Sequence, residues 1–105
     1  MSRHFYPTQT KDAVPVTVTC GWDRPLQGFF LTITSQGQHS GNLFCNIRDR
    51  PEQPHPPTFE PFLEPLAELG IELPDSLLRE IEADSAANAG NKIVDHSNGV
   101  RQALH

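Results

Sequence analysis

Strict alternation of apolar and polar side chains marks the stretch Val14-Pro15-Val16-Thr17-Val18-Thr19-Cys20. A period of two residues is typical of a β-strand with one buried face, so the valines and Cys20 are expected on that face. Because proline has no N–H to donate to a neighbouring strand, Pro15 marks either the start of the strand or a sheet edge. The stretch therefore predicts a half-buried strand around which the other elements are arranged.

Two further stretches repeat this pattern, at residues 29–34 and 43–48. The side chains predicted to face the core together with Cys20 are Phe29, Leu31, Ile33, Leu43, Cys45 and Ile47. Glycine and other turn-forming residues separate the stretches, which favours an antiparallel meander. Residues 4–10 are expected to add a fourth strand.

Proline dominates the next segment. Four of the nine residues 49–57 are proline, which forces an extended connector. The two alternatives are a mobile linker and a strap packed on the sheet. We favour the strap, because a chain of 105 residues has little material for a second folding unit.

Helical spacing of apolar residues follows the connector. Residues 59–69 predict a first helix, whose regular part is 62–69 with Pro65 in its first turn. A second helix is expected from Asp75, which can cap it, to about residue 88.

The predicted fold class is α+β: a three- to four-stranded antiparallel meander with two C-terminal helices packed on one face. A single domain covers residues 1–105, divided into the sheet (1–48), the proline-rich connector (49–58), the helices (59–90) and a polar tail (91–105). In the tail, Ile93 and Val94 suit a short strand or a strap, and fraying is expected beyond them.

Composition excludes several classes of function. The chain has 8 Lys and Arg against 13 Asp and Glu, a net charge of -5, whereas direct binding of nucleic acid needs a basic surface. The sequence has no apolar run of ~18 residues for a membrane span and no signal peptide. We therefore expect a cytoplasmic protein without a membrane partner.

The two cysteines are both predicted to face the core, about two strand spacings or ~10 Å apart, which is too far for a disulfide. They are interpreted as small core side chains, with a reactive Cys20 as the alternative. The five histidines, at positions 4, 39, 55, 96 and 105, show no paired spacing typical of a metal site. No nucleotide-binding or nucleophile motif is present, so we expect no cofactor, no metal and no catalysis.

Acidic residues concentrate in residues 59–84, where eight carboxylates and one arginine give a net charge of -7. Glu60, Glu64 and Glu68 are spaced to share one face of a helix. Three interpretations remain open: a docking face for a basic protein, a nucleic-acid mimic, and a solvated face that keeps the protein soluble.

Two further features suggest binding. Phe30 and Phe44 are predicted side by side on the sheet face opposite the core, as an exposed aromatic pair. In the turn that follows the first strand, Trp22 and Arg24 are residue types favoured at interfaces. The alternatives are that another segment covers the aromatic pair, that the pair mediates a homodimer, and that the turn is a structural corner.

The stretch Gly21-Trp22-Asp23-Arg24-Pro25-Leu26-Gln27, followed by Phe29-Phe30-Leu31, resembles a group of small bacterial proteins, as does Leu69-Gly70-Ile71-Glu72-Leu73-Pro74. The resemblance spans most of residues 14–92 and leaves out the proline-rich connector. Members of this group look like accessory proteins, some carried on plasmids or other mobile elements. The resemblance implies a bacterial interaction or regulatory protein and carries over no site residue.

The leading hypothesis is a non-catalytic binding or regulatory module that engages a protein partner. Phe30 and Phe44 would supply contact area, and the three glutamates would steer a basic partner. The alternative from another class is a small-molecule binder or small enzyme. Its pocket would lie between sheet and helices or at the Trp22 to Arg24 turn.

Overall fold

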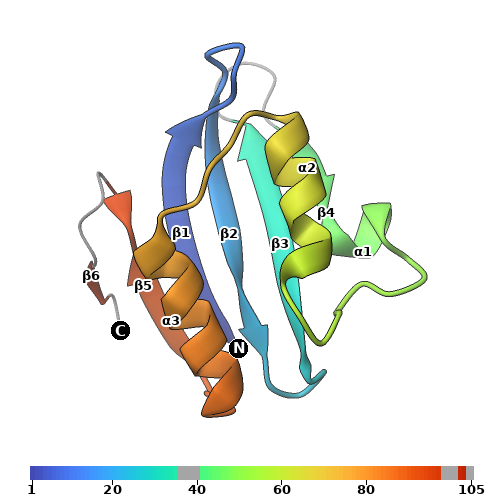
Figure 1. The fold of residues 1–105 in the computed structure, drawn as a ribbon, viewed down its shortest axis with the longest axis vertical. Helices are drawn as coiled ribbons and strands as arrows, with labels where there is room; N and C mark the ends of the chain where they lie inside the picture. The colour runs from blue at the N-terminus through green and yellow to red at the C-terminus, as the bar shows by residue number, and fades with distance from the viewer. Residues whose placement is uncertain (36–40, 98–101, 104–105) are drawn as a thin grey trace.

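The computed structural model describes residues 1–35, 41–97 and 102–103, which form a layer of sheet and a layer of helices (Figure 1). The sheet has six strands in the order β4-β3-β2-β1-β5-β6. Their bounds are β1 (Ser2–Gln9), β2 (Pro15–Asp23), β3 (Gly28–Ser35), β4 (Gly41–Cys45), β5 (Lys92–Asp95) and β6 (Gln102–Ala103). The predicted α+β class is confirmed.

Strands β1 to β4 pair antiparallel in chain order, and the predicted N-terminal strand is present as β1. The prediction of a purely antiparallel sheet is wrong at the other edge of β1, where β5 pairs parallel and places Val94 opposite His4. Val94 is fully buried. Backbone bonds from Lys92 to Met1 and from His96 to Phe5 also hold this strand, so of the two alternatives for Ile93 and Val94 the short strand is confirmed.

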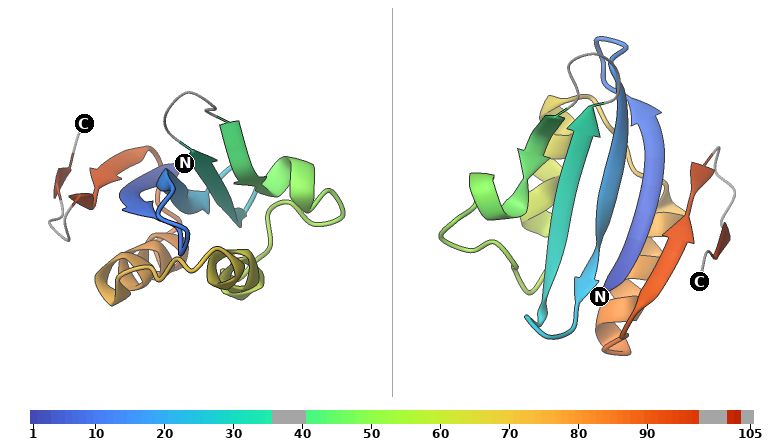
Figure 2. Two further views of the ribbon diagram at one scale, coloured as in Figure 1. Left: turned by 90° about the horizontal axis from the view of Figure 1, so that it is seen from above. Right: turned by 180° about the vertical axis from the view of Figure 1, so that it is seen from behind.

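The helices lie on one face of the sheet, as Figure 2 shows from above. A 3₁₀ turn, η1 (Glu60–Phe62), leads into α2 (Leu63–Glu68), and α3 (Asp75–Ala86) follows. Pro74, not Asp75, occupies the N-cap position of α3, and no side chain caps this helix. Side chains that build the core between the layers include Val18, Leu31, Ile33, Phe59, Phe62, Leu66, Leu77 and Ile81. Among the described helices, none is both long and apolar enough to cross a membrane.

In strand β4 the side chain that faces the helices is Phe44, and not Leu43 and Cys45 as predicted. A register shift places Phe44 opposite Ile33 and Asn42 opposite Thr34, so Leu43 is an extra residue on β4. Phe44 is 6% exposed and packs edge-on against Phe62, whereas Leu43 is 44% exposed. A bulge reverses the alternation of the strand beyond it, and the period within one strand cannot reveal it.

The strand is also shorter than predicted, because a short helix, α1 (Asn46–Asp49), begins directly after Cys45. Ile47 is consequently exposed instead of inward. Cys45 lies opposite Thr32 and Cys20 opposite Leu31, so the two cysteines face opposite sides of the sheet. Both thiols are free, and only Cys20 is fully buried.

The proline-rich connector is a strap packed along the edge of β3. The backbone N–H of Phe29 donates to the carbonyl of Pro56 at 2.9 Å, and Asn46 Nδ2 donates to the carbonyl of Pro54 at 2.7 Å. Contact with Gly28 is so close that a Cβ there would lie 2.1 Å from the carbonyl oxygen of His55. The structure therefore favours the strap over the mobile linker.

Candidate functional site

Phe30 and Phe44 do not form the predicted exposed pair. Phe30 lies on the sheet face away from the helices, whereas the bulge turns Phe44 toward them. Their exposed fractions are only 8% and 6%. An open aromatic patch built from these two side chains is therefore excluded.

In the turn between β2 and β3, Trp22 and Asp23 have structural roles. Trp22 is buried, and its Nε1 donates to Asn88 Oδ1 at 3.3 Å. Asp23 Oδ1 accepts the backbone N–H of Leu26 at 3.2 Å, which closes the turn. Arg24 is exposed and lines a surface hollow of about 230 Å³, together with Met1, Pro25, Gly90 and Asn91.

Glu60, Glu64 and Glu68 are all exposed on the helix layer, as their charge requires. Glu60 lies in η1 and the other two lie in α2. Within the part of the chain that the structure describes, none of the three forms an ion pair. Their negative charge is therefore available to a partner.

An apolar hollow of about 190 Å³, called here the α2–α3 groove, includes two other carboxylates, Glu72 and Asp75, in its lining. Its lining residues are Leu63, Leu66, Ala67, Ile71, Glu72, Leu73, Asp75 and Leu78. Leu66, Ile71 and Leu73 are buried, but Leu63 is 46% exposed. The helical spacing of apolar residues in 59–69 could not show that Leu63 stays partly uncovered.

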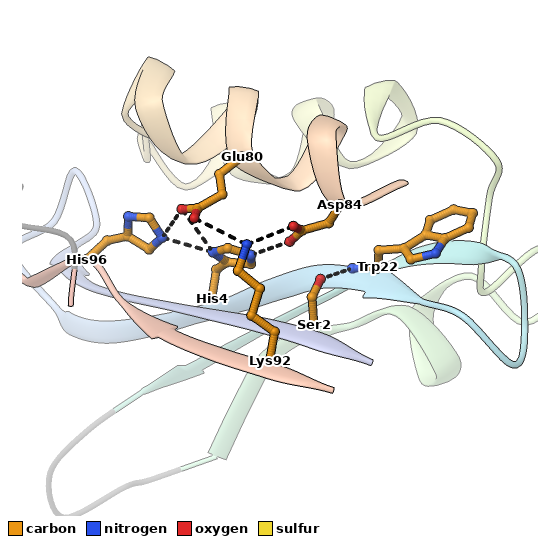
Figure 3. A network of polar contacts seen from close by, with 7 residues as sticks. All are labelled: Ser2, His4, Trp22, Glu80, Asp84, Lys92 and His96. Carbon is orange, nitrogen blue, oxygen red and sulfur yellow. Dashed lines mark hydrogen bonds and ion pairs between the residues drawn. The ribbon is translucent and has the colours of Figure 1, made fainter. Parts of the chain in front are cut away.

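A second constellation, absent from the sequence predictions, is a buried cluster of charged and polar side chains under α3 (Figure 3). His4 Nδ1 lies 2.9 Å from His96 Nε2, and His4 Nε2 lies 2.7 Å from Asp84 Oδ2. Lys92 Nζ donates to Asp84 Oδ1 at 2.9 Å and lies 3.3 Å from Glu80 Oε1. These five residues are called here the His4 cluster.

The fold explains why these residues meet. His4 alternates with the exposed Arg3, so it points from β1 toward the helices, and the parallel β5 leads the chain to His96 beside it. Glu80 and Asp84 are four residues apart and share the side of α3 that faces the sheet (Figure 3). The i, i+4 carboxylates next to the buried Ile81 were the sequence signal available, but His4, the partner of Asp84, lies 80 residues away in the chain.

Charge balance in the His4 cluster is maintained by mutual pairing. Burial acts to raise the pKa of Asp84, but hydrogen bonds from Lys92 and His4 outweigh it and hold that pKa below its ordinary value. Burial acts to lower the pKa of Lys92, and its bonds to Asp84 and Glu80 raise it instead. Asp84 and Lys92 are therefore both charged at neutral pH.

Comparison of the chain with protein families, curated proteins and solved structures finds no match. The resemblance of the Gly21 to Leu31 stretch to small bacterial proteins stays a prediction. Function has to be inferred from the two constellations themselves.

Proposed function

We propose that this protein is a non-catalytic cytoplasmic binding module that takes a basic, amphipathic segment of a partner protein into the α2–α3 groove. One observation carries the proposal: a partly open apolar groove lies among carboxylates that have no ion-pair partner in the described residues. An apolar floor favours burial of a side chain, and a negative rim favours lysine or arginine beside it.

The size of the groove supports a peptide anchor over a small molecule. Pockets for small molecules usually enclose about 300–1,000 Å³. The α2–α3 groove, at about 190 Å³, suits one or two apolar side chains projecting from a segment that lies across it. Leu63 is the natural anchor contact, because its exposed part would be covered by such a segment.

Charge supports a basic partner. Eight carboxylates lie in residues 59–84, and only Glu80 and Asp84 among them form ion pairs with described residues. The remaining acidic side chains produce a negative field on the helix layer that accelerates the approach of a basic surface. The nucleic-acid mimic shares this charge but has no use for an apolar groove, so the groove favours the amphipathic segment.

The test uses a fluorescent synthetic peptide of about 14 residues, four helical turns, with leucines spaced to form one stripe and lysines elsewhere. We expect saturable one-to-one binding by fluorescence anisotropy, weaker at about 0.3 M than at 0.02 M salt. Replacement Leu63→Gln should weaken binding about tenfold, which corresponds to roughly 1.4 kcal/mol for the lost anchor contact.

Leu26→Gln is the matched control, because Leu26 is likewise exposed but lies in the β2–β3 turn, outside the groove. A peptide of the same composition with its leucines scrambled controls for charge alone. Equal binding of both peptides, or equal losses from Leu63→Gln and Leu26→Gln, would show that the groove is not the binding site. Competition by duplex DNA for a basic target protein, without binding of the Leu/Lys peptide, would favour the mimic instead.

A further inference from the structure

Three potential metal-binding atoms converge in the His4 cluster (Figure 3). They are His4 Nδ1 from β1, Glu80 Oε2 from α3 and His96 Nε2 from the residue after β5. The separations are 2.9 Å between the two nitrogens, 3.8 Å from His4 Nδ1 to Glu80 Oε2, and 3.6 Å from His96 Nε2 to the same oxygen.

This triangle has the dimensions of one side of a metal coordination sphere. A tetrahedral ion with bonds of about 2.0–2.1 Å holds its ligand atoms about 3.3 Å apart. The three separations here average about 3.4 Å, so an ion about 2.1 Å from all three atoms lies about 0.6 Å out of their plane, as a tetrahedral ion does. The two distances to Glu80 are too long for hydrogen bonds, but they match ligands that share an ion.

Neighbouring side chains orient the donors. When neutral His4 donates through Nε2 to Asp84 Oδ2 at 2.7 Å, its Nδ1 is unprotonated and accepts from His96 Nε2 at 2.9 Å. A metal ion would replace that hydrogen bond, with the proton of His96 moving to its Nδ1. This carboxylate–histidine arrangement is the usual second layer of a metal site. Lys92 engages Glu80 through Oε1, at 3.3 Å, and leaves Oε2 as the oxygen directed at the histidines.

We propose that His4, Glu80 and His96 bind a divalent transition-metal ion of the zinc class. Two imidazoles and one carboxylate suit Zn²⁺, whereas Mg²⁺ and Ca²⁺ prefer oxygen ligands alone. With neutral imidazoles, the charges of Glu80, Asp84 and Lys92 sum to -1, so a cation is electrostatically favoured. Glu80 and Lys92 are 17% and 27% exposed, which gives an ion a route into the cluster.

The ion would join β1, α3 and the end of β5, and β1 is far from the other two in the sequence. Three protein ligands leave a position for water or a ligand from the partner. The inference stands independently of the α2–α3 groove, since the groove is lined by other residues. Sequence spacing had indicated no metal, because the ligands are 76 and 16 residues apart along the chain.

The experiment begins with the full chain dialysed against a chelator and then titrated with Zn²⁺ in competition with a chromophoric chelator. We expect one ion per chain and a rise in Tm of several degrees at saturation. Co²⁺ should give the intense visible bands of a tetrahedral site. In ¹⁵N-resolved spectra of the Zn²⁺-loaded protein, His4 should be metal-bound at Nδ1 and protonated at Nε2.

Glu80→Gln should lower Zn²⁺ affinity about 10- to 100-fold while leaving the chain folded, because glutamine keeps the shape of the side chain. Glu82→Gln, an exposed glutamate in the same helix, is the matched control and should bind as the wild type does. His96→Asn should also abolish the Co²⁺ bands. Wild-type protein that binds no Zn²⁺, or equal affinity of the Glu80 and Glu82 variants, would overturn the proposal and leave the histidines joined only by their hydrogen bond.

Discussion

Replacement of Phe44 by alanine tests which side chains of β4 face the helices. Phe44 is 6% exposed and packs against the ring of Phe62, so Phe44→Ala should lower the free energy of unfolding by about 3–4 kcal/mol through lost transfer energy and a cavity. Leu43 is 44% exposed, so Leu43→Ala should cost only about 0.5–1 kcal/mol. The neighbouring substitutions therefore differ severalfold, in the order opposite to the sequence prediction.

The assay is urea unfolding followed by far-ultraviolet circular dichroism, with the slope m compared between variants. A domain of this size has a stability of about 5–15 kcal/mol, so most of the expected range leaves Phe44→Ala folded. Should it be too unstable to measure, Phe44→Leu supplies a milder loss of about 1–1.5 kcal/mol. A larger loss for Leu43→Ala than for either Phe44 variant would refute the bulge and restore uninterrupted alternation in β4.

Three further outcomes follow from the packing. Burial raises the pKa of the Cys20 thiol to about 12, so iodoacetamide at pH 8 should alkylate Cys45 in the native protein and Cys20 only in urea, as peptide mass spectrometry would show. Gly28→Ala should lower the free energy of unfolding in urea by about 1–3 kcal/mol, because its Cβ would lie 2.1 Å from the carbonyl oxygen of His55 in the strap. Gly90→Ala should lower it much less, because the atom nearest to its Cβ is the flexible tip of Arg24. Equal losses of stability in the two variants would argue against the packed strap. Hydrogen bonds from Arg48 and from the Cys45 backbone lower the pKa of Asp49, so this carboxylate stabilises the fold above its ordinary pKa of 3.8 and loses that effect as pH falls through the lowered pKa. Asp49→Asn should therefore be less stable than wild type at pH 6 and equally stable in acid. A difference in stability that stays constant with pH would contradict this.

Much of the fold was readable from local pattern. Alternation at Val16 and Val18 gave β2, the same period gave β3, and helical spacing gave α2 and α3 close to their observed positions. The spacing of apolar residues predicts these elements because it follows which side of a strand or helix is buried. The strap was also predictable, because prolines restrict the backbone wherever they occur.

The errors in the sheet have one physical cause, which is the way one strand pairs with another. Leu43 is an extra residue only relative to the partner strand β3, so the reversed face of Phe44 has no local signature. The docking of β5 depends on the edge of β1 that the antiparallel meander leaves unpaired. His4 and His96 meet through this pairing, so the His4 cluster could not be predicted from spacing.

The groove illustrates a different gap between sequence and structure. Leu63 and Leu66 fit the same apolar stripe, yet one is half-exposed and the other buried. Leu66 belongs to the core cluster between helices and sheet, whereas Leu63 does not. The acidic charge beside them was evident from the sequence, but its role became interpretable only next to an apolar groove.

The measurement that tests the proposed function most directly is a ¹H–¹⁵N correlation spectrum of the labelled protein during titration with the Leu/Lys peptide. We expect shifts confined to η1, α2, α3 and the link between the helices, largest near Leu63, Ile71 and Leu78, and absent in the Leu63→Gln variant. Shifts centred on the strands, on the face that carries Phe30, or no shifts at all, would contradict a docking site in the α2–α3 groove.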